Sequence, residues 1–209
     1  MAKDIVLPID ERYVDLFFAP VRSKKDIISL LMNTVKYITT EFKVDNGSSS
    51  FLHIVIDDMN RFIYESENKV FSIRSPFNMT MGDEGELVFY TSDIPIVDSA
   101  ITSKTLLLVA DEKFDSPDSM DFISLLEEVF EEDFEQYWLF VKNLLTFEDG
   151  YVRFDHDPEH VDGRLHPLTH LDICYTTAST YKIGTYRMPC VQYFRELLNT
   201  KTESLYLER

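Results

Sequence analysis

The alternation of hydrophobic and polar residues divides the chain into helical and strand-like segments. Ser23 stands three positions before Asp26, as in a capping box, and apolar residues then recur every three to four positions. A second helical stripe begins near residue 118, and Pro189 suits the first turn of a third helix. The pattern therefore predicts helices over residues 24–43, 118–146 and 190–199.

Short segments rich in β-branched and aromatic residues lie between the first two helices. They read FLHIVIDD, RFIYESENKVFSIRS, ELVFYTS and TLLLVAD, and they begin at residues 51, 61, 86 and 105. Turn-forming residues separate them, which predicts four or five strands, several of them in consecutive hairpins. We expect a single α+β domain over residues 1–209, with an antiparallel sheet of about five to seven strands and the three helices packed on it.

The length and composition of the chain are typical of a soluble globular protein. A chain of 209 residues that is 44% hydrophobic can bury a core without help from disulfides or metals. Charged residues occupy the N-terminal segment, and no apolar run approaches the roughly 18 residues of a membrane span. Cys174 and Cys190 match no zinc or disulfide pattern. We expect a soluble cytoplasmic protein with reduced thiols and no membrane partner.

Acidic residues are concentrated in the first three quarters of the chain. Residues 1–150 hold 29 Asp and Glu against 13 Lys and Arg, whereas residues 151–209 hold 8 against 7. Such an acidic surface repels phosphate backbones and favours a protein partner with a basic surface. Five glutamates of the second helix are either a solvated face or a docking face for that partner: Glu127, Glu128, Glu131, Glu132 and Glu135.

Candidate chemistry gathers in residues 155–172, DHDPEHVDGRLHPLTHLD, which hold four of the five histidines. Strand alternation puts Asp155 on one face of an outgoing strand and aligns His170 with Asp172 on a returning one. A hairpin-like return would bring these three residues together, with His166 at the mouth. If Leu171 and its alternate neighbours face the core, His170 and Asp172 share the exposed face.

The residues of this segment suit either metal binding or acid–base catalysis, and they can also have a purely structural role. Asp155, His170 and Asp172 are a mixed oxygen and nitrogen set for Mn, Zn, Mg or Fe(II). Alternatively Asp155, His166 and His170 act as acids and bases while Arg187, before the last helix, holds an anion. The acidic residues can also simply cap turns. The basic residues nearby can accept a short nucleic acid or nucleotide: Arg153, Arg164, Lys182 and Arg187.

Two function classes follow from these observations. The first is a metal-dependent phosphodiesterase or nuclease-like enzyme, and the second is a noncatalytic acidic subunit or inhibitor that binds a basic protein. The sequence contains no GxGxxG, GxxxxGK[ST] or GxSxG motif, which gives no support to dinucleotide enzymes, P-loop NTPases or α/β-hydrolases.

The segments VRFDHDP, HPLTHLDI and YRMPCVQYFRELLN resemble the C-terminal signature of DUF2290, a prokaryotic family of unknown function. The resemblance covers about 50 residues and departs at Asp172, where the family pattern has histidine. The family's Arg-x-Asp motif with its following histidine cluster is loosely similar to small toxin-like proteins of mobile elements. This similarity implies nucleic-acid processing in defence or in a toxin–antitoxin system. The matching positions are Arg153, Asp155, His166, Pro167, His170, Arg187 and Pro189.

Overall fold

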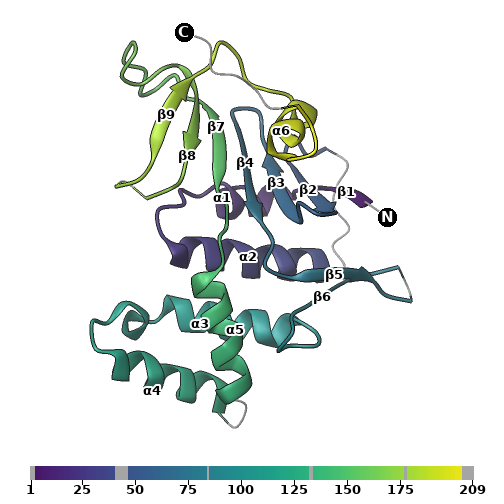
Figure 1. The fold of residues 1–209 in the computed structure, drawn as a ribbon, viewed down its shortest axis with the longest axis vertical. Helices are drawn as coiled ribbons and strands as arrows, with labels where there is room; N and C mark the ends of the chain where they lie inside the picture. Colours follow the sequence, from purple (N-terminus) through teal and green to yellow (C-terminus); the bar gives the residue numbers. More distant parts are fainter. Residues whose placement is uncertain (1–2, 41–46, 84, 132–133, 177, 204–209) are drawn as a thin grey trace. The chain divides into compact units, whose positions relative to one another are not determined.

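The computed structural model describes residues 3–40, 47–83, 85–131, 134–176 and 178–203, which form two compact units (Figure 1). Unit 1 comprises residues 1–19, 44–74 and 150–209, and unit 2 comprises residues 20–43 and 75–149. The mixed α+β class is confirmed, while the organisation as one domain stays a prediction. No helix within the described ranges has the length and apolar character needed to span a membrane.

Unit 1 is built on a seven-stranded sheet in which every neighbouring pair is antiparallel, as predicted. Consecutive hairpins form one half of the sheet, and the chain returns after residue 150 to add the other half. The order across the sheet is β1 (Lys3–Pro8), β2 (Phe51–Ile56), β3 (Arg61–Glu65), β4 (Lys69–Arg74), β7 (Val152–His156), β8 (Thr169–Ile173) and β9 (Tyr181–Gly184).

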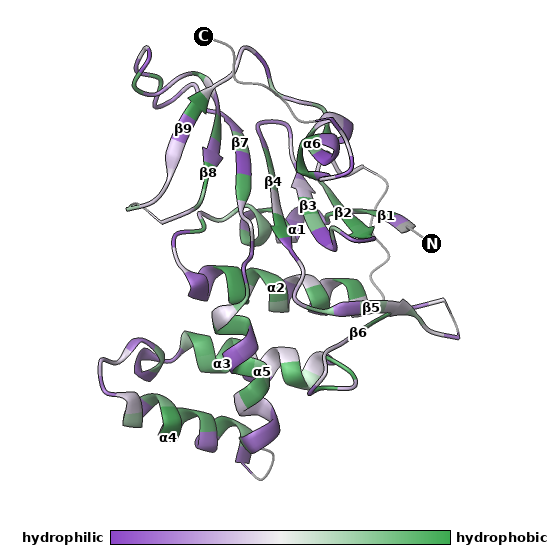
Figure 2. Cartoon of the chain, in the orientation of Figure 1, coloured by the Kyte–Doolittle hydropathy of each residue, from purple (hydrophilic) through white to green (hydrophobic). Residues whose placement is uncertain are grey.

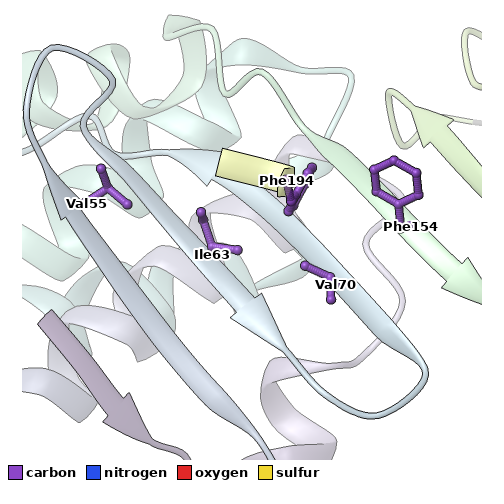
Figure 3. Packing of buried hydrophobic residues seen from close by; sticks show 5 residues of the cluster. All are labelled: Val55, Ile63, Val70, Phe154 and Phe194. Atoms are coloured by element: carbon purple, nitrogen blue, oxygen red, sulfur yellow. The ribbon is translucent and has the colours of Figure 1, made fainter. Parts of the chain in front are cut away.

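A short C-terminal helix, α6 (Val191–Leu198), covers one face of this sheet. Its fully buried Phe194 packs among apolar side chains from four strands, as Figure 3 shows: Val55, Ile63, Val70 and Phe154. The Phe154 and Phe194 rings meet edge to face with centroids 5.5 Å apart. Because strand side chains alternate, the neighbours of Phe154 in β7 point to the opposite face. The core contact of α6 therefore fixes which face receives Arg153 and Asp155.

The opposite face of the sheet is also apolar over its central strands. Helix α1 (Glu11–Phe17) places the Phe17 ring 5.8 Å from that of Tyr64, and Tyr64 stacks on Phe71 at 4.5 Å. Phe71 of β4 lies beside Arg153 of β7 in the strand register. The aromatic core of this face thus continues directly into the polar residues of β7 and β8.

Unit 2 consists of helices and a two-stranded sheet. Its elements are α2 (Lys24–Thr39), β5 (Asn78–Met81), β6 (Leu87–Tyr90), α3 (Ser99–Ala110), the 3-10 turn η1 (Glu112–Asp115), α4 (Ser119–Phe130) and α5 (Phe134–Thr146). The predicted start of α2 is confirmed, since Ser23 and Asp26 form a reciprocal capping box. The predicted end at residue 43 is wrong, because the helix ends at Thr39 and Thr40 is already extended; residues 41–43 lie outside the described residues.

The prediction of a strand at TLLLVAD is wrong, because residues 105–110 belong to helix α3. The run of leucine and valine after Thr105 has no polar stripe, and Figure 2 colours part of α3 as strongly hydrophobic. A short, fully apolar run does not distinguish a buried strand from a buried helix by its period. Asp98 is the missed signal, since its side chain caps the helix by accepting from the Ile101 N–H.

The predicted helix over residues 118–146 is two helices. Helix α4 ends at Phe130, where Glu131 adopts a left-handed φ of 53°, and α5 begins at Phe134. A positive φ is uncommon for glutamate. The break was missed because neither glycine nor proline, the usual signals for the end of a helix, stands at this point of the sequence. Of the predicted acidic face, Glu127, Glu128, Glu131 and Glu135 are exposed, and Glu132 lies outside the described residues.

Candidate functional site

The predicted convergence of Asp155 with His170 and Asp172 is confirmed by the register of β7 and β8. Asp155 lies directly opposite His170, and Arg153 lies opposite Asp172. Directly opposed residues of an antiparallel pair share one face with closely spaced side chains. The alternation of two short strands is therefore sufficient to bring these four side chains together.

The expectation that His170 and Asp172 lie on an exposed face is wrong. Both residues are buried, with relative exposures of 0% and 3%, whereas Leu171 on the other face is only partly buried. The reason is that the face of His170 continues the aromatic core around Phe71, while the face of Leu171 is the one that α6 covers. Polar side chains buried in this way require charged or hydrogen-bonding partners.

Arg153 provides such a partner for both carboxylates. Its guanidinium donates to Asp172 Oδ2, and its Nε lies 2.6 Å from Asp155 Oδ2 in a charge contact without hydrogen-bond geometry. Burial by itself lowers the pKa of Arg153, but the neighbouring Tyr151, Asp155 and Asp172 raise that pKa above its ordinary value. The guanidinium is therefore a fixed positive charge between the two aspartates.

Lys182 of β9 is the second cation of the cluster. Its ammonium lies 2.9 and 3.1 Å from the two carboxylate oxygens of Asp172 and 2.8 Å from His170 Nε2. The β8–β9 register places Lys182 opposite Asp172 and thereby on the same face. Sequence reasoning assigned Lys182 only to a basic patch, because it did not predict β9, a short and mostly exposed strand that pairs with β8 as a hairpin.

His170 is held in one orientation by a backbone carbonyl. Its Nδ1 lies 2.8 Å from the Pro167 carbonyl oxygen, which can only accept, so Nδ1 carries a proton and Nε2 faces Lys182. Gly184 lies opposite His170 on β9, and a Cβ there would approach Pro167 Cγ to 3.1 Å. Gly184 thus leaves the space in which Pro167 orients the imidazole.

The three predicted ligands can supply a common set of donor atoms. One atom from each of Asp155, His170 and Asp172 lies within 4.8 Å of the others. Two carboxylates with one imidazole suit divalent Mn or Zn, and a ligating histidine commonly donates its other N–H to a carbonyl, as His170 does. The residues present fit a divalent cation, which would contact the same Asp172 oxygens and His170 nitrogen as Lys182.

His166 and Arg187 lie apart from this donor set. The His166 ring lies 4.7 Å from the His170 ring, but its Nδ1 contacts the His160 carbonyl oxygen and its Nε2 is buried without a hydrogen bond. Arg187 is exposed after β9 and forms no ion pair with any described acidic residue. The ion pair with Asp172 is formed by Arg153, which leaves Arg187 outside the cluster.

Two further titratable residues border the cluster, and sequence reasoning assigned neither of them to the site. Burial and the charge of Arg153 lower the pKa of Lys69 from 10.5 to about 8, although Asp155 and Asp172 oppose this effect. Burial raises the pKa of Tyr151 to about 12. Tyr151 precedes β7 by one residue, and Lys69 lies opposite Asp155, so strand alternation places both on the face of the cluster.

Stability should increase between about pH 8 and 10 because of Lys69. Its folded pKa of about 8 lies below its ordinary 10.5, so the unfolded chain binds more protons in this window and the free energy of unfolding rises with pH. Above about pH 10 the raised pKa of Tyr151 has the opposite effect. Urea unfolding at pH 7.5, 8.5 and 9.5, about one unit apart, measures the rise. Lys69→Met should lack it, and equal profiles for the two proteins would contradict this assignment.

Comparison with known proteins provides no evidence on function, so a functional assignment depends on the geometry of the site. The chain matches no known family model, and neither a curated protein nor a solved structure is significantly similar to it.

Proposed function

We propose that the chain is a metal-dependent phosphodiesterase whose divalent cation is held by Asp155, His170 and Asp172. The observation that carries the proposal is the convergence of these three donor groups from two adjacent strands. Such a cation polarises a phosphoryl oxygen and lowers the pKa of bound water toward neutrality. The resemblance to DUF2290 extends the proposal to a nuclease-like component of prokaryotic defence or of a toxin–antitoxin system.

Energetic considerations favour a functional role for this cluster. Two carboxylates and a guanidinium are gathered at a largely buried position, and the partly exposed ammonium of Lys182 pairs with one of the carboxylates: Asp155, Asp172, Arg153 and Lys182. Replacing buried ion pairs by apolar residues of similar volume is often neutral or stabilising, so stability alone does not require such a group. The pKa values of Arg153, Lys69 and Tyr151, which lie in or beside the cluster, are shifted from their ordinary values, and such shifts are characteristic of functional sites.

The other polar residues have supporting roles in this proposal. Arg153 holds the two carboxylates in their relative positions, and the Pro167 carbonyl keeps His170 Nε2 available as a ligand. His166, beside His170, has a buried nitrogen without a hydrogen bond and can exchange a proton with the substrate. Arg187 is exposed and can bind a phosphate group after a movement of its flexible side chain.

Hydrolysis of bis(4-nitrophenyl) phosphate and of short single-stranded RNA and DNA tests the proposal. We expect turnover with Mn²⁺, Zn²⁺ or Mg²⁺, none with EDTA, and a loss of roughly 100-fold or more in Asp155→Asn, which removes one charged ligand at nearly constant volume. Asp162→Asn is the matched control, since Asp162 is an exposed carboxylate in the same β7–β8 connection. Equal rates for the wild type and Asp155→Asn would contradict the proposal.

A noncatalytic acidic subunit is the second candidate function. Residues 20–43 and 75–149, which make up unit 2, hold 20 Asp and Glu against 8 Lys and Arg. Glu127, Glu128 and Glu131 are exposed at the end of α4. These charges are complementary to a basic protein surface, and binding to it would weaken as salt increases. This candidate replaces the first if the protein neither binds a divalent cation nor hydrolyses a phosphodiester.

A further inference from the structure

Lys182 occupies the position at which the proposed cation would contact its ligands. Its ammonium is within 3.1 Å of both oxygens of Asp172 and 2.8 Å from His170 Nε2. Both Asp172 and His170 are ligands of the proposed metal site. A divalent ion bound by the same atoms would sit about 2 Å from each, so the ion and the ammonium cannot be bound together.

The position of Lys182 in the fold allows it to leave. Strand β9 is the last strand of the sheet order and pairs only with β8 among the described strands. The Lys182 side chain is 32% exposed, whereas those of His170 and Asp172 are 1% and 4% exposed. A lysine has a flexible four-carbon stem and a strongly hydrated head group, so its ammonium can move into solvent without a change in the backbone.

The charge of the cluster gives this exchange a direction. The charges of Asp155 and Asp172 are offset by those of Arg153 and Lys182, and Lys69 is a further cation on the same face. A divalent cation in the place of Lys182 adds one positive charge to the buried part of the cluster, and the released ammonium remains a cation at its edge. Such a site attracts an anionic group such as phosphate.

We infer that Lys182 is a built-in competitor of the cation, and that its displacement creates the anion site of the enzyme. This inference rests on the proposed function, because it concerns the same three ligands. The order of binding follows from it, with the cation first and the phosphate group second.

Isothermal titration with Mn²⁺ tests the competition. We expect Lys182→Met to bind Mn²⁺ about 10-fold or more tightly than the wild type, because the apparent affinity is reduced by the fraction of molecules in which the lysine fills the site. Lys25→Met is the matched control, since Lys25 forms a comparable 2.9 Å pair with Asp115 in unit 2. Its Mn²⁺ affinity should equal that of the wild type.

Amine labelling of the wild-type protein provides a second measurement that needs no variant. Acetylation of Lys182, followed by mass spectrometry, should increase when Mn²⁺ is added, while that of Lys25 stays constant. Equal Mn²⁺ affinities for the wild type and Lys182→Met, or unchanged Lys182 labelling despite Mn²⁺ binding, would overturn the inference and leave the proposed function intact. Absence of Mn²⁺ binding in both proteins would overturn both.

Discussion

Asp172→Asn should lower the free energy of unfolding by about 3–5 kcal/mol, the cost of leaving buried charges without their partner. Asp172 is 3% exposed and receives hydrogen bonds from both Arg153 and Lys182. Asparagine keeps the volume but removes the charge that both cations face. The positive charge of Arg153 cannot be relieved by deprotonation, so its desolvation is then offset by Asp155 alone.

Urea unfolding of the wild type, Asp172→Asn and Asp115→Asn measures this effect. Asp115 also pairs with a lysine, at 2.9 Å from Lys25, but its side chain is 65% exposed. Exposed ion pairs contribute at most about 1 kcal/mol, so the control should remain close to the wild type. Similar small losses in both variants would show that water reaches the Asp172 cluster more freely than its burial indicates.

The sequence predicted the features that depend on local periodicity. Alternation along YVRFDH and HLDICYTT placed Asp155, His170 and Asp172 on one face, and the antiparallel return of the chain brought them together. The same reasoning located the hairpin of β3 and β4 and the helices α2 and α6. These elements are determined by residue spacing, which a single sequence contains in full.

The errors occurred where tertiary structure outweighs local pattern. The run LLLVA within TLLLVAD has no polar residue to set a period, so its pattern was compatible with a strand or a helix. The helix break at Glu131 has neither glycine nor proline to mark it. The burial of His170 was missed because both faces of β8 are covered to some extent, and alternation does not show which face is covered more deeply.

Sequence reasoning also missed the network that surrounds the predicted ligands. Lys182 reaches His170 through the pairing of β9 with β8, and Lys69 reaches Asp155 through the pairing of β4 with β7. The first contact requires the strand β9, which was not predicted. The second contact joins segments that are distant along the chain, so it depends on strand order rather than on spacing. Arg187, by contrast, was assigned to the site from its place before α6, and the structure shows it exposed without an ion pair to the described cluster.

His170→Phe should weaken Mn²⁺ binding by roughly 100-fold or more, since it removes the one nitrogen ligand while keeping a ring of similar volume. His170 is fully buried, and its Nε2 lies 3.8 Å from Asp155 Oδ2 and 3.7 Å from Asp172 Oδ2. His160→Phe is the control, because its side chain is 70% exposed in the same β7–β8 connection. Circular dichroism of both variants establishes that the fold is retained.

Electron paramagnetic resonance of Mn²⁺ bound to the protein tests most directly whether Asp155, His170 and Asp172 hold a divalent cation. The account predicts a single bound ion whose spectrum carries the coupling of one imidazole nitrogen. This coupling should persist in His160→Phe and disappear in His170→Phe. Absence of a bound ion in the wild-type protein, or a bound ion whose nitrogen coupling is unchanged in His170→Phe, would contradict the account.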